Sequence, residues 1–290
     1  DFVSLDIGSA PDDRVPGAHA HAIGVKPVAT FLAAWEQMQA DAAAGTVRTI
    51  AVVGGGAAGI EVLLAMHARV TTALGAAAPR FALITDRPHL LPEHPPAVRA
   101  RIGRILVERG VVLHLDSPAV AVERGAVVVA HGRRIAADRI VWALAAAAAP
   151  WLAASGLDCD ERGFVQVDDT LRSPSHPFAF AAGDCATQVR HPRPRSGVFA
   201  VRQGPPLAAN LRRAALGEPL AVYVPQRRAL ALITTGGRHA IASRGPFVAA
   251  GAWVWRWKDR IDRRFMAKYV APPNAASASV AAGADRPPSP

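Results

Sequence analysis

Apolar runs of strand length alternate with longer amphipathic stretches through the first half of the chain. Residues 49–53, 81–85 and 111–115 are short, mainly apolar runs. The stretches between them, 57–74 and 95–109, carry apolar residues at helical spacing. Parallel strands need a long crossover connection, which is usually a helix, so this alternation predicts an α/β fold with a parallel sheet covered by helices.

Shorter strands follow the third apolar run. We expect strands at 117–123 and 126–130 joined by a turn at Glu123–Gly125, a second turn at 131–134, and a buried strand at 139–143. A βαβαβ unit closed by a small β-meander is the arrangement of a three-layer, Rossmann-like dinucleotide-binding domain.

Strand and helix patterns also occur on both sides of this unit. On its N-terminal side we expect a short strand within residues 1–10 and a helix over 28–44. On its C-terminal side we expect strands at 163–168 and 178–182 and a helix at about 199–215.

The last part of the chain predicts a hairpin, a helix and a tail. Strands at 229–235 and 238–243 flank two adjacent glycines, which are typical of a two-residue hairpin turn. A helix is expected over 253–269. Residues 271–290 have the low-complexity composition of a disordered tail.

A stripe of large apolar residues follows one face of this last helix, because they recur every four residues. They are Trp253, Trp257, Ile261, Phe265 and Tyr269. Arg and Lys outnumber Asp and Glu on the same stretch, and a basic, Trp-rich amphipathic helix can lie on a membrane surface. The alternative is that the stripe packs onto the chain's own core or onto a dimer partner.

A glycine motif with the spacing G-x-G-x-x-G follows the first strand of the unit. Gly54, Gly55, Gly56 and Gly59 carry it. Gly54 permits a tight turn, Gly56 lets a pyrophosphate approach the backbone, and Gly59 lets the helix pack close to the sheet. Because the motif ends a strand and opens a helix inside a βαβ unit, it favours dinucleotide binding over an ordinary glycine-rich turn.

The end of the second strand leaves the nicotinamide cofactor undecided. Asp86 in that position is able to bind the ribose hydroxyls, which favours NADH, whereas Arg87 is able to receive a 2′-phosphate, which favours NADPH. A third interpretation is that both are solvated loop charges.

Composition narrows the class of protein. The 290 residues are 51% hydrophobic, which is typical of a globular chain. The formal net charge is +10, but no block of basic residues lies along a predicted groove-reading helix, so we do not expect nucleic-acid binding. The only cysteines, Cys159 and Cys185, form no CxxC, so neither a redox-active dithiol nor a metal site is expected.

Several motifs carry a family resemblance when taken in chain order. GSAP at 8–11, the glycine motif and FAFAAGDCA at 178–186 resemble the two-dinucleotide-binding-domain flavoproteins of the FAD-dependent pyridine nucleotide-disulfide oxidoreductase superfamily. Within it the chain is most similar to the type II NADH dehydrogenase branch, and especially to the flavoprotein domain fused to selenide, water dikinase. SLDIGS, VKP and the segments 197–213 and 252–266 carry that finer resemblance.

The resemblance implies two cofactors, FAD and NAD(P)H, and a set of site residues. It implies that Asp184, after Gly183, binds the flavin ribityl chain, and that Gly8 lies in the FAD-binding part. It places Gln203 at the start of a segment that faces the flavin pyrimidine, and Glu61 near the point where nicotinamide meets flavin, as the candidate catalytic residue.

The implied activity is that of an NAD(P)H oxidoreductase, in which hydride passes from nicotinamide to FAD and electrons then pass to an acceptor. The acceptor is expected to be a quinone, another small molecule or a fused partner. The protein is expected in the cytoplasm or as a peripheral protein on the inner membrane face. The alternative is a non-catalytic nucleotide-binding module that docks with, or is fused to, a selenide, water dikinase.

The chain departs from the family pattern at three places. The first FAD-binding βαβ segment is missing, so the chain is expected to be N-terminally truncated. Leu144 and Ala145 stand where the family has Thr-Gly, so the crossing between domains is expected to shift. Arg202-Gln203 replaces a pair of glutamines in the quinone segment, which weighs against a quinone.

The domain organisation follows from the elements and the resemblance together. We expect a remnant of the FAD-binding domain at 1–44, the NAD(P)-binding domain at 45–147, the return segment of the FAD-binding domain at 148–220, the C-terminal hairpin and helix at 221–270, and the tail at 271–290.

Overall fold

A parallel sheet forms the centre of the larger lobe. The computed structural model describes residues 1–12, 14–144 and 146–269. The strand order is β3 (Ile23–Gly24), β10 (Arg139–Trp142), β4 (Thr49–Val53), β5 (Arg80–Ile84) and β6 (Val112–His114), and every neighbouring pair is parallel. The predicted parallel sheet is therefore present, with β3 as an edge strand that the sequence pattern did not reveal.

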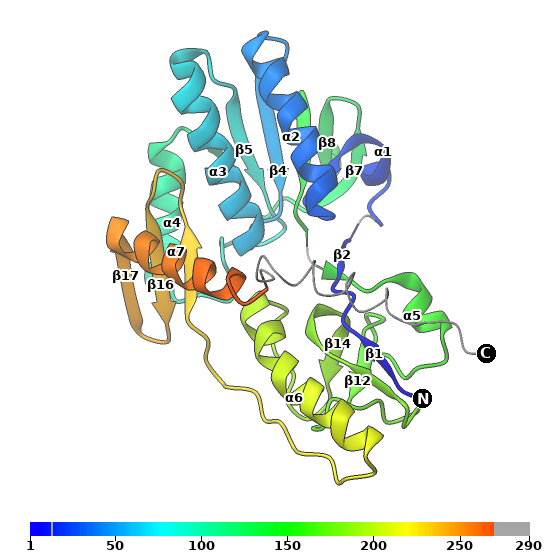
Figure 1. Ribbon diagram of the computed structural model, residues 1–290. Coiled ribbons are helices and arrows are strands. Elements are labelled where there is room, and N and C mark those ends of the chain that lie inside the picture. The colour runs from blue at the N-terminus through cyan, green and yellow to red at the C-terminus, as the bar shows by residue number, and fades with distance from the viewer. Residues whose placement is uncertain (13, 145, 270–290) are drawn as a thin grey trace, which may run out of the picture.

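This lobe has three layers: the helices, the parallel sheet and the meander (Figure 1). Alternate side chains of each strand point to the two faces of the sheet. Ile50 and Val52 of β4 pack with three helices, α2 (Val28–Ala43), α3 (Ala57–Leu74) and α4 (Pro96–Glu108). Ala51 and Val53 pack on the other face, against the meander. Residues 57–77 have the length and composition of a membrane span, but Ile60, Leu63 and Leu64 in this stretch are buried in the core, as in a core helix.

The meander has three strands, β7 (Ala119–Glu123), β8 (Ala126–Val129) and β9 (Arg134–Ala136), all antiparallel. The sequence pattern predicts only the first two and assigns Arg134 to a turn. In β9, Ile135 is buried and its neighbours Arg134 and Ala136 are exposed. A single large apolar residue is too weak a pattern to predict a strand.

The smaller lobe joins segments that are far apart in the sequence. β1 (Val3–Leu5) pairs in parallel with β13 (Ala179–Ala181), and β12 (Val165–Val167) pairs with β14 (Ala186–Gln188). The helix α6 (Gly197–Ala215) covers them. The remaining short elements are β2 (Ala10–Pro11), α1 (Ala18–His21), β11 (Ala146–Ala147), α5 (Pro150–Ala154) and the 3₁₀ turns 75–77, 130–132 and 183–185.

The boundary predicted at residue 44 does not coincide with a change of packing. β3 belongs to the parallel sheet, and Met38 of α2 is buried in the core of the larger lobe. Residues 23–43 therefore pack with the larger lobe, whereas the sequence groups them with the FAD-binding remnant.

The C-terminal part is a three-stranded antiparallel sheet, β15 (Ala231–Thr234), β16 (Ala240–Arg244) and β17 (Phe247–Gly251), followed by α7 (Ala252–Met266). The turn predicted over the two residues Gly236-Gly237 is one residue longer. Thr234 pairs with Ala240 and Thr235 N donates to the His239 carbonyl, so Gly236, Gly237 and Arg238 form the loop, with φ of 75°, 61° and 58°. The tail predicted at 271–290 lies outside the described residues.

Candidate functional site

The glycine motif forms the turn between β4 and α3. Gly54 has φ of 130°, and a Cβ there would overlap the carbonyl oxygen of Ala143. The backbone of 143–144 therefore crosses directly beside the turn, and Ala143 N donates to the Val53 carbonyl at 2.9 Å. Glycine at position 54 makes this close crossing possible although Leu144 is bulky, and Ala145 lies outside the described residues.

The rest of the motif shapes a surface open to a ligand. A Cβ on Gly59 would overlap the Gly54 carbonyl oxygen, so this glycine gives the close helix packing that the spacing predicts. Gly56 is exposed, and nothing lies within 4 Å of where its Cβ would be. No side chain caps α3, which begins at Ala57, so its first N–H groups and helix dipole face this open space.

The loop beyond β5 lies against the same turn. Thr85 is buried, and a Cβ on Gly55 would lie 2.8 Å from its Oγ1. Asp86 and Arg87 both remain exposed and form an ion pair of 3.4 Å with each other. The residue that favours NADH and the residue that favours NADPH are therefore paired with each other at this position.

A second turn, at Gly183–Cys185, follows β13 in the smaller lobe. Gly183 has φ of 73°, and its N–H donates to Gln203 Oε1 of α6 at 2.7 Å. A Cβ on Gly183 would lie 2.5 Å from Asp6 Oδ1, so a side chain here would displace Asp6 as well as strain the backbone. The structure thus brings together two residues, Gly183 and Gln203, that the sequence singles out separately.

The carboxylate of Asp184 receives two long contacts from the N-terminal segment. Ser9 Oγ, next to Gly8, donates to Asp184 Oδ2 at 3.3 Å, and Lys26 Nζ lies 3.4 Å from the same oxygen. Partial burial and the negative charge of Asp184 raise the pKa of Asp6. Two carboxylates and one lysine therefore share this turn.

Lys26 also connects the two lobes. It follows β3 closely, and its neighbour Val25 donates to the Trp142 carbonyl at the carboxyl end of the parallel sheet. Its ammonium reaches Asp184 in the smaller lobe. The sequence pattern identifies Lys26 only as part of a resemblance motif, and its pairing with Asp184 depends on the fold.

Arg195 is a further residue that sequence reasoning missed. Its Nε donates to the Asp184 carbonyl at 3.2 Å, a terminal nitrogen donates to Thr187 Oγ1 at 2.7 Å, and its guanidinium lies 3.3 Å from the Phe164 ring centroid. Loss of hydration lowers the pKa of Arg195. The hollow between this turn and α6 has a volume of about 20 Å³, room for roughly one water.

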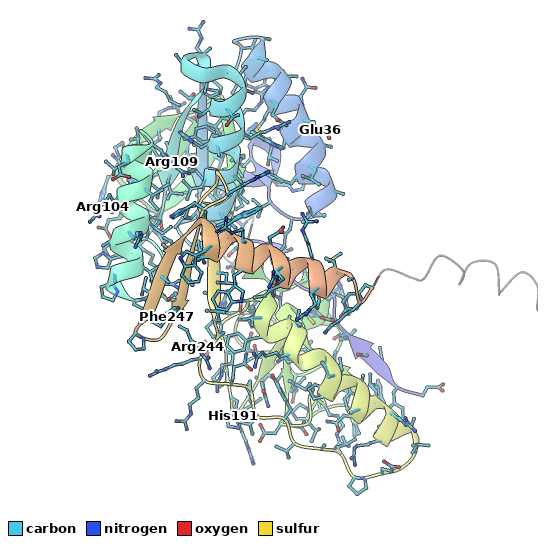
Figure 2. All side chains as sticks on the ribbon, turned by 60° about the vertical axis from the view of Figure 1, so that its left-hand side comes forward. Glu36, Arg104, Arg109, His191, Arg244 and Phe247 are labelled. Atoms are coloured by element: carbon cyan, nitrogen blue, oxygen red, sulfur yellow. The ribbon has the colours of Figure 1, made fainter. Side chains whose placement is uncertain are left out.

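Glu61 lies in the second turn of α3 and binds the C-terminal sheet. Its Oε1 accepts hydrogen bonds from Thr234 N and Thr234 Oγ1, both at 2.8 Å. Nearby, Arg109, which is labelled in Figure 2, donates to the Thr235 carbonyl. A Cβ on Gly236 would lie 2.7 Å from the Leu64 carbonyl oxygen. The catalytic role expected for Glu61 stays a prediction, whereas its contacts fasten the C-terminal sheet to α3.

The two cysteines are not paired. Cys185 is buried and Cys159 is partly buried, both are free, and burial raises the pKa of each thiol. Among the described residues no group of His, Cys, Asp and Glu has the arrangement of a metal site.

Comparison with known proteins identifies the family. The family described as pyridine nucleotide-disulphide oxidoreductase matches residues 7–204. An NADH dehydrogenase-like protein of Mycobacterium tuberculosis is 32% identical over 141 residues, 48% of this chain and 35% of the relative. A type II NADH:quinone oxidoreductase of Haemophilus influenzae is 28% identical over 149 residues, 49% of this chain and 34% of the relative. These alignments thus span about a third of each curated relative's length.

Solved structures show the same fold at low identity. The sulfide:quinone oxidoreductase of Aquifex aeolicus superposes with a TM-score of 0.74 at 15% identity, covering 92% of this chain and 68% of that one. NDH2 of Plasmodium falciparum superposes with a TM-score of 0.72 at 11% identity, covering 91% and 74%. The predicted fold class, a Rossmann-like α/β protein with two dinucleotide-binding domains, is confirmed.

Proposed function

Because the chain belongs to the pyridine nucleotide-disulphide oxidoreductase family, we propose that it carries hydride from NAD(P)H to FAD and passes the electrons to a small acceptor. One observation supports this most. Lys26 extends from the carboxyl end of the parallel sheet to Asp184 in the other lobe, so the Asp184 turn faces the same edge of the sheet at which the glycine turn lies. Dinucleotides bind outside the carboxyl ends of such strands.

The glycine turn is suited to a nicotinamide nucleotide. The open space at Gly56 and the uncapped N–H groups of α3 would hold its pyrophosphate, because both donors and helix dipole favour an anion there. Asp86 or Arg87 would contact the adenosine ribose.

The second turn fits the ribityl end of FAD. The two contacts of Asp184 exceed 3.2 Å, so its carboxylate retains capacity to accept hydrogen bonds from hydroxyl groups. Gln203 would hold the Gly183 backbone in place, and Gly8 would keep the neighbouring loop compact. Lys26 would orient Asp184 and maintain its charge. Glu61 is proposed to lie near the reacting rings, with Thr234 fixing its carboxylate.

The acceptor is proposed to be a quinone, since a quinone oxidoreductase is among the relatives. None of the relatives described above is a selenide, water dikinase, so a partnership with such an enzyme stays a prediction. Arg202, beside Gln203, is exposed and would lie at the acceptor's approach.

Purified full chain tests the redox function directly. With added FAD, we expect flavin absorbance that bleaches on adding NADH or NADPH without oxygen and returns on adding a soluble quinone. The variant Asp184→Asn should retain less flavin than the wild type. Its affinity for NADH, measured by the fluorescence of the nucleotide, should be unchanged and serves as the control. Nucleotide binding without retained flavin or turnover would instead establish the alternative, a nucleotide-binding module.

The C-terminal helix supports a second proposal, peripheral contact with a membrane. Val254 is fully buried against the C-terminal sheet, whereas Trp253 is 50% exposed and Trp257 is 37% exposed, and their rings stack with centroids 6.4 Å apart. Packing of both tryptophans into the chain's own core is therefore wrong for the described residues. Exposed Arg256, Arg260 and Arg264 would favour anionic headgroups.

Vesicle sedimentation separates a membrane from a second copy of the chain. We expect binding to phosphatidylglycerol-containing vesicles, lost in the double variant W253S/W257S because the rings supply the buried apolar area. Trp151→Ser is the matched control, since Trp151 is 50% exposed on the other lobe. Binding by the double variant equal to that of the wild type, or a wild-type dimer that the double variant converts to a monomer, would contradict the proposal.

A further inference from the structure

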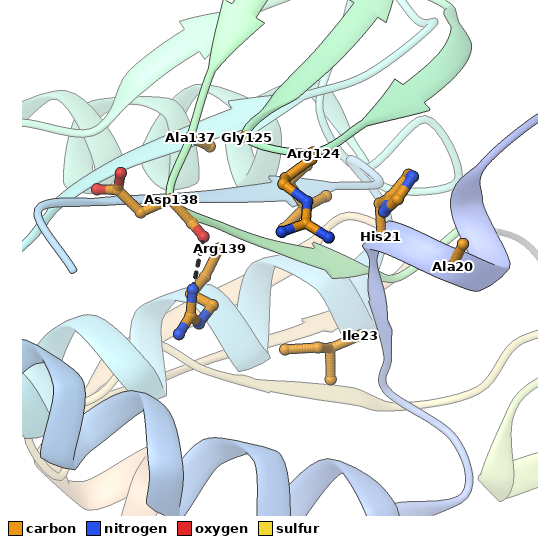
Figure 3. A pocket seen from close by; sticks show the side chains of 9 residues that line it. Ala20, His21, Ile23, Arg124, Gly125, Ala137, Asp138 and Arg139 are labelled. Atoms are coloured by element: carbon orange, nitrogen blue, oxygen red, sulfur yellow. Dashed lines mark hydrogen bonds between the residues drawn. The ribbon is translucent and has the colours of Figure 1, made fainter. Parts of the chain in front are cut away.

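A second hollow lies at the opposite end of the parallel sheet from the glycine turn. It has a volume of about 370 Å³ and is lined by α1, the start of β3, the turn between β7 and β8, and the start of β10 (Figure 3). The amino ends of the strands face it, whereas the dinucleotide edge is at their carboxyl ends. A ligand here would therefore occupy a site separate from both cofactor turns.

Two arginines and a histidine line this hollow. Arg124, Arg139 and His21 come from three different elements and border the same space (Figure 3). Arg124 is exposed, and none of the described side chains forms an ion pair with it. Arg139 pairs with Asp41 at 2.6 Å and donates to the Asp138 carbonyl, which uses only two of its five N–H donors.

The nearby carboxylates are directed elsewhere. Asp138 lines the hollow, but its Oδ2 accepts from Arg48 N, Thr49 N and Thr49 Oγ1 at 2.8–2.9 Å, and its carboxylate points away in Figure 3. Glu123, next to Arg124, pairs with Arg134 instead. Asp41 compensates the charge of Arg139, so among the described residues the unpaired positive charge at the hollow is that of Arg124.

We propose that this hollow binds a phosphate monoester, with the phosphate between Arg124 and Arg139. A guanidinium fork matches phosphate oxygens bidentately, so Arg124 would supply the unpaired charge, and Arg139, which pairs with Asp41, would supply its remaining N–H donors. The hollow's volume of about 370 Å³ is many times the roughly 30 Å³ that one water takes up, so it has room for more than a phosphate group. Ile23 and Ala20 provide an apolar wall for the attached organic group. Because Ala20 and His21 belong to α1 and Arg139 belongs to β10, a bound ester would connect α1 to the sheet.

Calorimetric titration of the full chain with phenyl phosphate tests the proposal. We expect one site whose affinity falls at least tenfold in Arg124→Gln, with Arg124→Lys in between because it keeps the charge but loses the fork. Arg104→Gln, at an exposed position of α4 outside the lining of the hollow, should bind as the wild type does. Saturating NADH should leave the affinity unchanged.

Three results would overturn the site. One is the absence of binding by the wild-type chain. Another is equal affinity of the wild type and a folded Arg124→Gln variant, checked by thermal melting. The third is displacement of phenyl phosphate by NADH, which would assign the binding to the glycine turn.

Discussion

At the scale of single residues, contacts explain why glycine occupies the key positions of this site. Gly54 and Gly59 lie so close to neighbouring backbone that a methyl group would collide with a carbonyl oxygen. A Cβ on Gly183 would lie 2.5 Å from a carboxylate oxygen of Asp6. The spacing in the sequence predicts the tight packing at Gly59, but the partner of Gly183 is visible only in the folded chain.

Gly59→Ala is expected to destabilise the protein by about 2–4 kcal/mol, because the added Cβ cannot move away from the Gly54 carbonyl without shifting α3. The free energy of unfolding in urea measures the effect. Gly103→Ala is the matched control: Gly103 lies inside α4 with nothing within 4 Å of a Cβ, so alanine there should stabilise by about 0.5–1 kcal/mol. Equal effects of the two substitutions would contradict the steric explanation.

At the scale of elements, the C-terminal sheet depends on a few polar contacts with the helical layer. Glu61 accepts two hydrogen bonds from Thr234, and Arg109 binds the next carbonyl. Ile233 and Ile241 complete the same core from the sheet side. The sheet is therefore part of the larger lobe's hydrophobic core, although it is remote in sequence.

A double-mutant cycle with Glu61→Gln and Thr234→Val should give a coupling energy of about 0.5–3 kcal/mol, since each substitution removes part of the same contact. Urea unfolding of both single variants and the double variant measures it. Lys258 and Asp262 form an exposed pair at 3.0 Å on α7 and provide the control cycle, with expected coupling below about 0.5 kcal/mol. Additive effects at Glu61 and Thr234 would show that the two side chains do not fasten the sheet.

At the scale of the whole molecule, partly buried histidines make the fold sensitive to acid. Burial lowers the pKa of four histidines, namely His67, His94, His114 and His239. Each stays neutral in the folded chain at a pH where the unfolded chain binds a proton. Their contribution to stability is therefore complete above about pH 6.5 and decreases as the pH falls below that value toward the folded pKa.

His67→Gln should reduce the loss of unfolding free energy between pH 7.5 and 5.5, by less than about 1 kcal/mol, because glutamine does not titrate. His67 Nε2 lies 3.1 Å from the Arg109 carbonyl, and a glutamine amide is able to donate there instead. His89→Gln, at an exposed loop position, is the control and should leave the pH dependence unchanged. A wild-type slope in the His67 variant would exclude this histidine as a source of the sensitivity.

The sequence by itself determined the features that depend on local spacing. Apolar runs and helical periodicity predicted the strands β4, β5 and β10 and the helices α2, α3 and α4 to within a few residues, and the glycine spacing predicted the β4–α3 turn. The strands β3, β14 and β17 escaped because they carry no run of large apolar residues: the first two are only two and three residues long, and β17 is rich in Ala and Gly.

Only the tertiary structure decided which distant side chains meet. Lys26 with Asp184 and Glu61 with Thr234 are pairs separated by more than 150 residues, and Gly183 with Gln203 joins a turn to a helix 20 residues later. No periodicity encodes such pairs, because they arise from the way the lobes and the C-terminal sheet pack. The same packing leaves Trp253 and Trp257 of α7 exposed and forms the second hollow, at the amino ends of the strands.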